Sequence, residues 1–379
     1  MLGGYGGFGR RIVQALTRDA VNELRPPLRV GVAGRRGDEA RRYCDELGAA
    51  SVKPLELDAH ASSGRARLFA AGPRVVIDTA GPFQHADRAL ARDCAQRGVH
   101  YIDLADDTAA VCGIIALDAE ARAHDALLVS GASTVPALSV AVADELAREL
   151  VVVERIEIGI APGYDGPRGL ATIRSILSYV GRPIPQWQDG RATSAPGWSG
   201  TMRHPYPAPV GSRLLSCVDV PDMALLPPRF PGLRTLEIRA GLEVPLAHRG
   251  LGGLAWLVGL GVLRGLERHA DLARRAAALL NPWGTDTGAM HVRVDGRDAA
   301  DRPRSRLWTV VATDGAGPQI PATAAVILAR RLLERSAPAL EVRGAMPAMG
   351  LVSLAEFQRA WQGFPLRTSI VDEADPVAR

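Results

Sequence analysis

The first twelve residues, MLGGYGGFGRRI, place five glycines directly before a helical pattern of apolar residues. Gly4, Gly6 and Gly9 have the G-x-G-x-x-G spacing that turns a strand into a helix beneath the pyrophosphate of a dinucleotide. The first glycine permits the turn, the second lets the backbone approach the phosphates, and the third allows close packing. The sequence predicts that the cofactor contacts Gly4, Tyr5, Gly6, Gly7, Phe8 and Gly9. The alternative is a glycine-rich turn that binds nothing.

The turn should follow a strand, yet only Met1, Leu2 and Gly3 precede it. In this fold the first strand lies in the middle of the sheet, between the second and fourth strands. We therefore expect a gap or a very short central strand at residues 1–3, together with weak cofactor binding. One hypothesis is that an upstream start of translation has been missed.

Short apolar runs alternate with helical patterns up to about Leu150. Strands are expected within residues 28–34, 52–59, 74–83, 99–107 and 126–134, with helices between them. This alternation without hairpin signals predicts a Rossmann-type, doubly wound parallel sheet of the α/β class, with its first strand nearly absent.

The pattern changes after Leu150. Strands are expected within residues 153–162, 213–220, 235–244, 290–296 and 305–315, and helices near 171–180, 251–266, 271–280 and 322–334. They predict a second, α+β domain on a mostly antiparallel sheet. Residues 181–211, rich in Pro, Gly and aromatics, are expected to form a long ordered loop.

One apolar stretch, Gly250 to Leu263, is shorter than the ~20 residues that a membrane-spanning helix needs. We expect a helix buried in the protein or at a subunit interface. The alternative is the wall of an apolar substrate site or a contact with a membrane surface.

The end of the second strand bears on the choice of cofactor. Enzymes that use NAD usually carry Asp or Glu there, whereas this chain has Arg35 and Arg36. A guanidinium can pair with a 2′-phosphate in two hydrogen bonds, so the two arginines favour NADP, with NAD left open. The alternative is that both are solvated surface residues.

Further candidates lie where other strands end, because ligands of such sheets bind outside the carboxyl ends of the strands. Asp58 is expected near the adenine, and Thr79, Ala80 and Gly81 near the nicotinamide ribose. Asp103 is the candidate catalytic residue, which would orient the substrate or move a proton. Its alternative role is to cap the following helix.

Composition excludes several classes of protein. A net charge of +4 on 379 residues, without a basic run that includes aromatics, gives no support for a nucleic-acid partner. The four cysteines form no C-x-x-C pair, which argues against disulfides or a metal site and fits a reducing cytoplasm. None of the four histidines near candidate site segments stands out as a general base: His85, His100, His204 and His248.

Several motifs occur together in the order known from one family. GGYGGFGRRIV, VAGRR, DTAGPFQ, DCAQRGVHYIDLADD and SGASTVPALSVAVADEL resemble the nucleotide-binding domain of the saccharopine dehydrogenase-like oxidoreductases. The resemblance is weaker in the second half.

The resemblance implies a nicotinamide-dependent oxidoreductase that acts on a small or lipid-like substrate, and a homodimer. The change of pattern after Leu150 predicts domains at residues 1–148 and 149–337, and the resemblance implies that a segment 338–379 returns to the first domain. The alternative function is a non-catalytic relative that binds a nucleotide as a sensor or structural protein.

Overall fold

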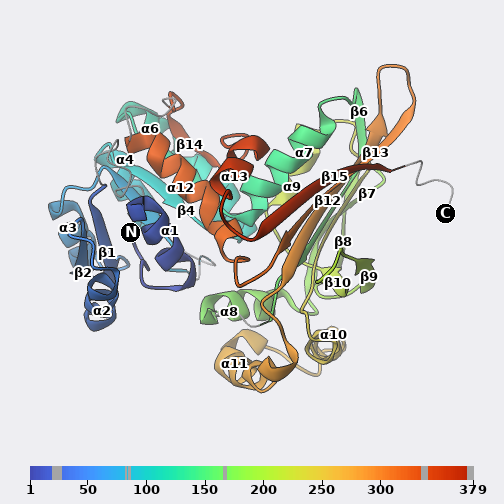
Figure 1. Cartoon of the computed structure of the whole chain (residues 1–379), viewed down its shortest axis with the longest axis horizontal. Helices are drawn as coiled ribbons and strands as arrows, with labels where there is room; N and C mark the ends of the chain where they lie inside the picture. Colours follow the sequence, from blue (N-terminus) through green and yellow to red (C-terminus); the bar gives the residue numbers. More distant parts are fainter. Residues whose placement is uncertain (19–27, 82, 84–86, 165–168, 334–339, 374–379) are drawn as a thin grey trace. The chain divides into compact units, whose positions relative to one another are not determined.

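The computed structural model describes the chain except residues 19–27, 82, 84–86, 165–168, 334–339 and 374–379. The fold comprises two compact units (Figure 1). The first unit is Met1–Leu138 with Pro318–Val352, and the second is Ser139–Gly317 with Ser353–Arg379. These bounds differ from the expected domains of residues 1–148, 149–337 and 338–379, which stay a prediction.

The first unit contains a parallel sheet. Four strands follow the order β14-β5-β4-β3, and β1 pairs with β2. Leu2 joins the two parts, because it bridges in parallel to Ala33 on one side and to Asp78 on the other. The strands are β1 (Val30–Gly34), β2 (Val52–Glu56), β3 (Val75–Asp78), β4 (His100–Asp103), β5 (Leu127–Ser130) and β14 (Gly344–Pro347).

Alternating residues of these strands face opposite sides of the sheet, and both sides are covered. Val76, Tyr101 and Leu128 pack in a cluster with apolar residues of α4 and α6. Helix α12 packs against β3, β4 and α1. The helices of this unit are α1 (Gly7–Arg18), α2 (Gly37–Leu47), α3 (Ser62–Ala70), α4 (Ala89–Gln96), α5 (Thr108–Gly113), α6 (Asp118–Ala123) and α12 (Gln319–Leu333).

This architecture confirms the predicted α/β class and the nearly absent first strand. Burial on both faces explains why the strands read as continuous β-branched runs in the sequence. The segment expected to return to the nucleotide domain divides between the units: β14 lies in the parallel sheet, whereas β15 lies in the sheet of the second unit.

The second unit is built on a mixed, mostly antiparallel sheet. Its order is β15-β13-β12-β6-β11-β10-β9, with β7 attached to β11 and β8 attached to β7. Only β6 and β11 are parallel neighbours among these named pairs. The strands are β6 (Val152–Ala161), β7 (Pro183–Gln188), β8 (Arg191–Pro196), β9 (Met202–Pro205), β10 (Ser212–Cys217), β11 (Thr235–Ala240), β12 (Gly288–Arg297), β13 (Pro303–Ala312) and β15 (Leu366–Glu373).

The long loop expected over residues 181–211 is wrong. That segment holds strands β7, β8 and β9, and β7 pairs with β8 in an antiparallel hairpin. Asp189 and Gly190 form its tip with φ of 51° and 74°. Two consecutive positive φ values are what the commonest two-residue hairpin turn requires, and Asp-Gly supplies them at low cost.

The helices of the second unit include the apolar stretch. They are α7 (Ser139–Ala147), α8 (Leu170–Tyr179), α9 (Asp222–Arg229), α10 (Pro245–Gly259), α11 (Ala270–Ala278) and α13 (Leu354–Ala360). The expected helix is α10, but the expectation of burial is wrong within this chain, because only His248 and Ala255 of α10 are buried. Among the described residues, no helix has the length and apolarity needed to cross a bilayer.

Candidate nucleotide site and a buried histidine cluster

A very short central strand leads into the glycine-rich turn. The amide of Leu2 donates to the carbonyl of Ile77 at 2.8 Å, and the amide of Gly3 donates to Ala33 at 2.9 Å. Thr79 donates twice to the carbonyl of Leu2, from its amide at 3.1 Å and from Oγ1 at 2.8 Å. The turn therefore starts between β1 and β3, at the carboxyl edge of the sheet.

Close backbone contacts explain the glycines of the turn. A Cβ on Gly9 would lie 2.1 Å from the carbonyl oxygen of Gly3, and a Cβ on Gly6 would lie 3.1 Å from the same oxygen. A Cβ on Gly4 would lie 3.1 Å from Met1 Cγ. Only glycine at position 9 lets the first turn of α1 pack this closely on the loop.

The first turn of α1 presents backbone amides to a ligand. In the described part of the chain, the N–H groups of Gly7, Phe8 and Gly9 have no acceptor. The positive end of the helix dipole and such amides together attract a phosphate. The Phe8 side chain is 39% exposed beside them. The turn therefore has the geometry of an anion-binding site.

Tyr5 connects the turn to the end of β1. Its hydroxyl accepts a hydrogen bond from the amide of Arg36 at 3.2 Å, and a Cβ on Gly34 would lie 2.3 Å from that hydroxyl. The guanidinium Cζ of Arg36 lies 5.4 Å from the centre of the Tyr5 ring, and Nη1 pairs with Glu39 at 2.5 Å. The side chain of Arg36 thus already contacts Tyr5 and Glu39 of the protein itself.

Arg35 differs from its neighbour. Its side chain is exposed and makes no hydrogen bond or ion pair with any residue that the structure describes. A guanidinium without a carboxylate beside it, next to the phosphate turn, is suited to a 2′-phosphate.

The other predicted cofactor contacts have mixed surroundings. Thr79 Oγ1 is committed to Leu2, whereas Ala80 is exposed and its amide donates to Asp78 Oδ1 at 2.8 Å. Gly81 lies against Phe83, whose ring would be 3.3 Å from an added Cβ. Asp58 Oδ1 accepts from the amide of His60 at 3.0 Å. Their roles toward a cofactor stay predictions.

Asp103 is a buried carboxylate at the carboxyl end of β4. Its Oδ1 accepts from Ala105 N at 3.0 Å, Gly131 N at 2.9 Å and Ser130 Oγ at 2.8 Å. Burial raises the pKa of Asp103 to about 6, although these three bonds lower it. The contacts hold the end of β4 to the end of β5. The predicted catalytic role of Asp103 is left as a prediction.

Two ionisable groups near the turn escaped the sequence analysis. The α-amino group of Met1 donates to the carbonyl of Gly31 at 2.9 Å, and burial lowers its pKa to about 6. Asp78 lies at the end of β3, where burial raises the pKa of its carboxyl group. Asp78 ends the apolar run of the predicted strand 74–83, so a carboxylate at the end of such a run was the available signal.

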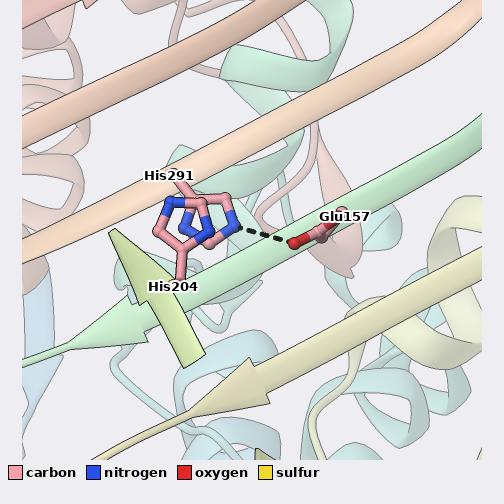
Figure 2. Close-up of side chains that lie close together, drawn as sticks. All are labelled: Glu157, His204 and His291. Atoms are coloured by element: carbon pink, nitrogen blue, oxygen red, sulfur yellow. Dashed lines mark hydrogen bonds and ion pairs between the residues drawn. The ribbon is translucent and has the colours of Figure 1, made fainter. Parts of the chain in front are cut away.

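A second cluster of ionisable groups lies inside the second unit. Glu157 of β6, His204 of β9 and His291 of β12 approach one another, with their ligand atoms within 4.8 Å (Figure 2). The rings of His204 and His291 are stacked, with centroids 3.7 Å apart and planes at 8°. His291 Nε2 lies 3.3 Å from Glu157 Oε1, and Nδ1 lies 2.8 Å from the hydroxyl of Tyr206. Gly159 makes room, because a Cβ there would lie 2.1 Å from the His291 ring.

The cluster keeps its carboxylate charged and His204 neutral. Burial raises the pKa of Glu157, but the bond to His291 and the charges of His291, Arg155 and Arg293 outweigh it and give a value of about 2. Burial, followed by the charge of His291, lowers the pKa of His204 to about 4. The hydrogen bonds from Tyr206 through His291 to Glu157 form one connected buried network.

The same side chains are poorly arranged for a shared metal ion. Imidazole donates its lone pair in the plane of the ring, and two stacked rings hold these planes parallel. Both nitrogens could face one ion only after a ring rotates. Of the histidines considered from sequence, His85 lies outside the described residues, and His248 Nε2 contacts Ser216 Oγ at 2.9 Å.

The parallel sheet, the glycine-rich turn and the unpaired amides of α1 define a Rossmann-type dinucleotide-binding domain. Residues 1–132 match the family model described as the saccharopine dehydrogenase NADP binding domain. The first part of this chain is therefore an NADP-binding domain of the saccharopine dehydrogenase type, and the chain is an NAD(P)-dependent oxidoreductase by class. No curated protein sequence matches it.

A solved structure shares the fold. Apo saccharopine dehydrogenase (L-Glu forming) from Saccharomyces cerevisiae superposes with a TM-score of 0.66 at 13% identity, covering 98% of each chain. A meso-dapdh mutant with DAP from Clostridium tetani E88 gives a TM-score of 0.45 at 12% identity over 94% of each chain. Because its identity is low, the first likeness shows the fold alone, and the second, with a TM-score below 0.5, carries no argument.

Proposed function

We propose that this protein transfers a hydride between NADP(H) and an unsaturated carbon (C=N, C=O or C=C) of a small or lipid-like substrate. The NADP-binding domain supports the cofactor, which supplies the hydride when bound. The residues of the chain would hold and orient it: the amides of α1 would face the pyrophosphate, and Ala80 and Gly81 would border the nicotinamide ribose.

The observation that carries the choice of NADP is the guanidinium of Arg35, which lies beside the phosphate turn and has no partner among the residues that the structure describes. Arg36 supports Tyr5 and is paired with Glu39, so it contributes less to recognition of the 2′-phosphate.

Turnover tests the hydride transfer. Oxidation of NADPH is followed at saturating cofactor with three substrate panels: cyclic imines, aldehydes and ketones, and enones that include long-chain members. The proposal is supported if NADPH is oxidised with one of these panels and if this oxidation requires an intact glycine turn at Gly9.

A second candidate is a non-catalytic protein that binds the nucleotide as a sensor or structural element. This candidate is favoured because Oδ1 of Asp103, the candidate catalytic residue, already accepts three hydrogen bonds from the protein. Tight NADPH binding without turnover in any panel would favour this candidate.

We also propose that the protein is cytoplasmic and forms a homodimer. All four cysteines are free thiols, which supports a reducing cytoplasm. Sedimentation velocity at micromolar concentration tests the homodimer.

A further inference from the structure

An unusual share of the exposed apolar side chains lies in one short part of the second unit. Among the described residues, seven of the fourteen large hydrophobic side chains that are exposed fall within residues 245–283. They define the α10–α11 patch: Leu246, Trp256, Leu260, Val262, Leu272, Leu279 and Trp283. Trp256 is 66% and Trp283 is 70% exposed, although tryptophan is normally well buried.

Part of the patch lies along one face of α10. Leu246, Arg249, Trp256 and Leu260 are spaced by three, seven and four residues, which places them on one face of α10 and its end. Figure 1 shows α10 and α11 at the same end of the second unit. An apolar pocket of about 550 Å³ opens beside α10, lined by residues that include Trp198, Leu214, Ala255, Trp256 and Leu260.

Unpaired cations accompany the apolar side chains. Arg249, Arg264, Arg268 and Arg275 are exposed, and none has a carboxylate partner in the described part of the chain. The two acidic residues of the segment are engaged, Glu267 with Arg182 at 3.3 Å and Asp271 with Arg274 at 3.7 Å. The surface therefore combines tryptophan, leucine and excess positive charge.

We infer that the α10–α11 patch docks on the surface of an anionic phospholipid bilayer. Tryptophan and leucine would enter the boundary between headgroups and acyl chains, while the arginines pair with lipid phosphates. A second copy of the chain is a poorer occupant, because a two-fold interface would bring the same unpaired arginines together. The inference is independent of the reaction that the protein catalyses.

Co-sedimentation of the full chain with vesicles tests the inference. Phosphatidylcholine vesicles with 30% phosphatidylglycerol are compared with pure phosphatidylcholine at low and high salt. We expect at least tenfold tighter binding to the anionic vesicles and a loss of affinity at high salt. Absence of binding to anionic vesicles would overturn the inference.

Two double variants separate the apolar and the charged contributions. Trp256→Ser with Trp283→Ser, and Arg264→Ser with Arg268→Ser, should each weaken vesicle binding at least tenfold. Matched controls are Ile115→Ser, an exposed apolar residue outside the patch, and Arg191→Ser, an exposed arginine outside it. Thermal melts confirm folding, and the inference fails if the controls weaken binding as much as the patch variants do.

Sedimentation velocity identifies the competing occupant. One outcome would assign the patch to a second copy of the chain and overturn the inference. In that outcome the unaltered chain is a dimer that does not bind vesicles, and both double variants are monomers.

Discussion

Arg36 lies over the ring of Tyr5, with its guanidinium Cζ 5.4 Å from the ring centre, while the adjacent Arg35 has no partner among the described residues. The two arginines that the sequence offers for a 2′-phosphate are therefore not equivalent. Arg36 fixes the tyrosine of the phosphate turn, and Arg35 remains available to a ligand.

This difference predicts a selective effect on cofactor affinity. Arg35→Ala should weaken NADPH binding by about 1–3 kcal/mol, the scale of a hydrogen bond to a charged group, and leave NADH binding nearly unchanged. Arg36→Ala is the control and should affect both cofactors alike, because it disturbs Tyr5. Calorimetric titration measures all four affinities. An equal loss of both cofactors in Arg35→Ala would refute the role of Arg35.

The glycine at position 9 gives a second prediction. Gly9→Ala should lower the melting temperature and abolish NADPH binding, since the new Cβ would overlap the backbone of Gly3 at a cost of about 1–3 kcal/mol or more. Gly31→Ala is the matched control, because a Cβ at position 31 would have no atom within 4 Å. Similar melting temperatures for the two variants would show that α1 does not pack this closely on Gly3.

A third prediction concerns pH. Burial lowers the pKa of the Met1 α-amino group from 8.0 to about 6, so the unfolded chain binds more protons between these values. The free energy of unfolding should therefore rise from pH 6 to pH 8, by about 3 kcal/mol at most from this group. Chemical denaturation across the range measures the slope.

The matched control for this titration is a chain with two apolar residues added before Met1, which replaces the amine by an amide. It should be more stable and should lose this part of the pH dependence. An unchanged slope in the extended chain would show that Met1 is not the titrating group.

Asp103 yields a fourth prediction. Asp103→Ala would leave the buried donors of Ala105, Ser130 and Gly131 without an acceptor, which should cost at least about 2 kcal/mol. Asp107→Ala, which removes the side-chain cap of α5, should cost about 1 kcal/mol. Urea unfolding compares them. If Asp103→Asn is stable but ends turnover, the carboxylate acts in catalysis; if Asp103→Ala is as stable as the parent, the structural role fails.

The nucleotide-binding half was readable from sequence because buried parallel strands give continuous β-branched runs that end in glycine or acidic residues. Such runs predicted where β1, β3 and β4 begin to within two residues, but the expected ranges extended past the observed ends of β3 and β4. The hairpin β7–β8 was missed because Pro183, Pro185 and Pro196 suggested a loop, although Asp189-Gly190 signalled a tight turn.

Other features depend on register and exposure, which single-sequence patterns do not contain. His291 lies opposite Gly159 and reaches Glu157 only through the pairing of β6 with β12, across 134 positions of chain. The exposure of α10 could not be predicted from the sequence either, because a short apolar helix has the same sequence pattern whether protein, lipid or water covers it.

The most direct measurement is the equilibrium affinity of the unaltered chain for NADPH and for NADH under the same conditions. We predict saturable binding of both cofactors, with NADPH at least tenfold tighter. Equal affinities, or binding of neither cofactor by correctly folded protein, would contradict this prediction.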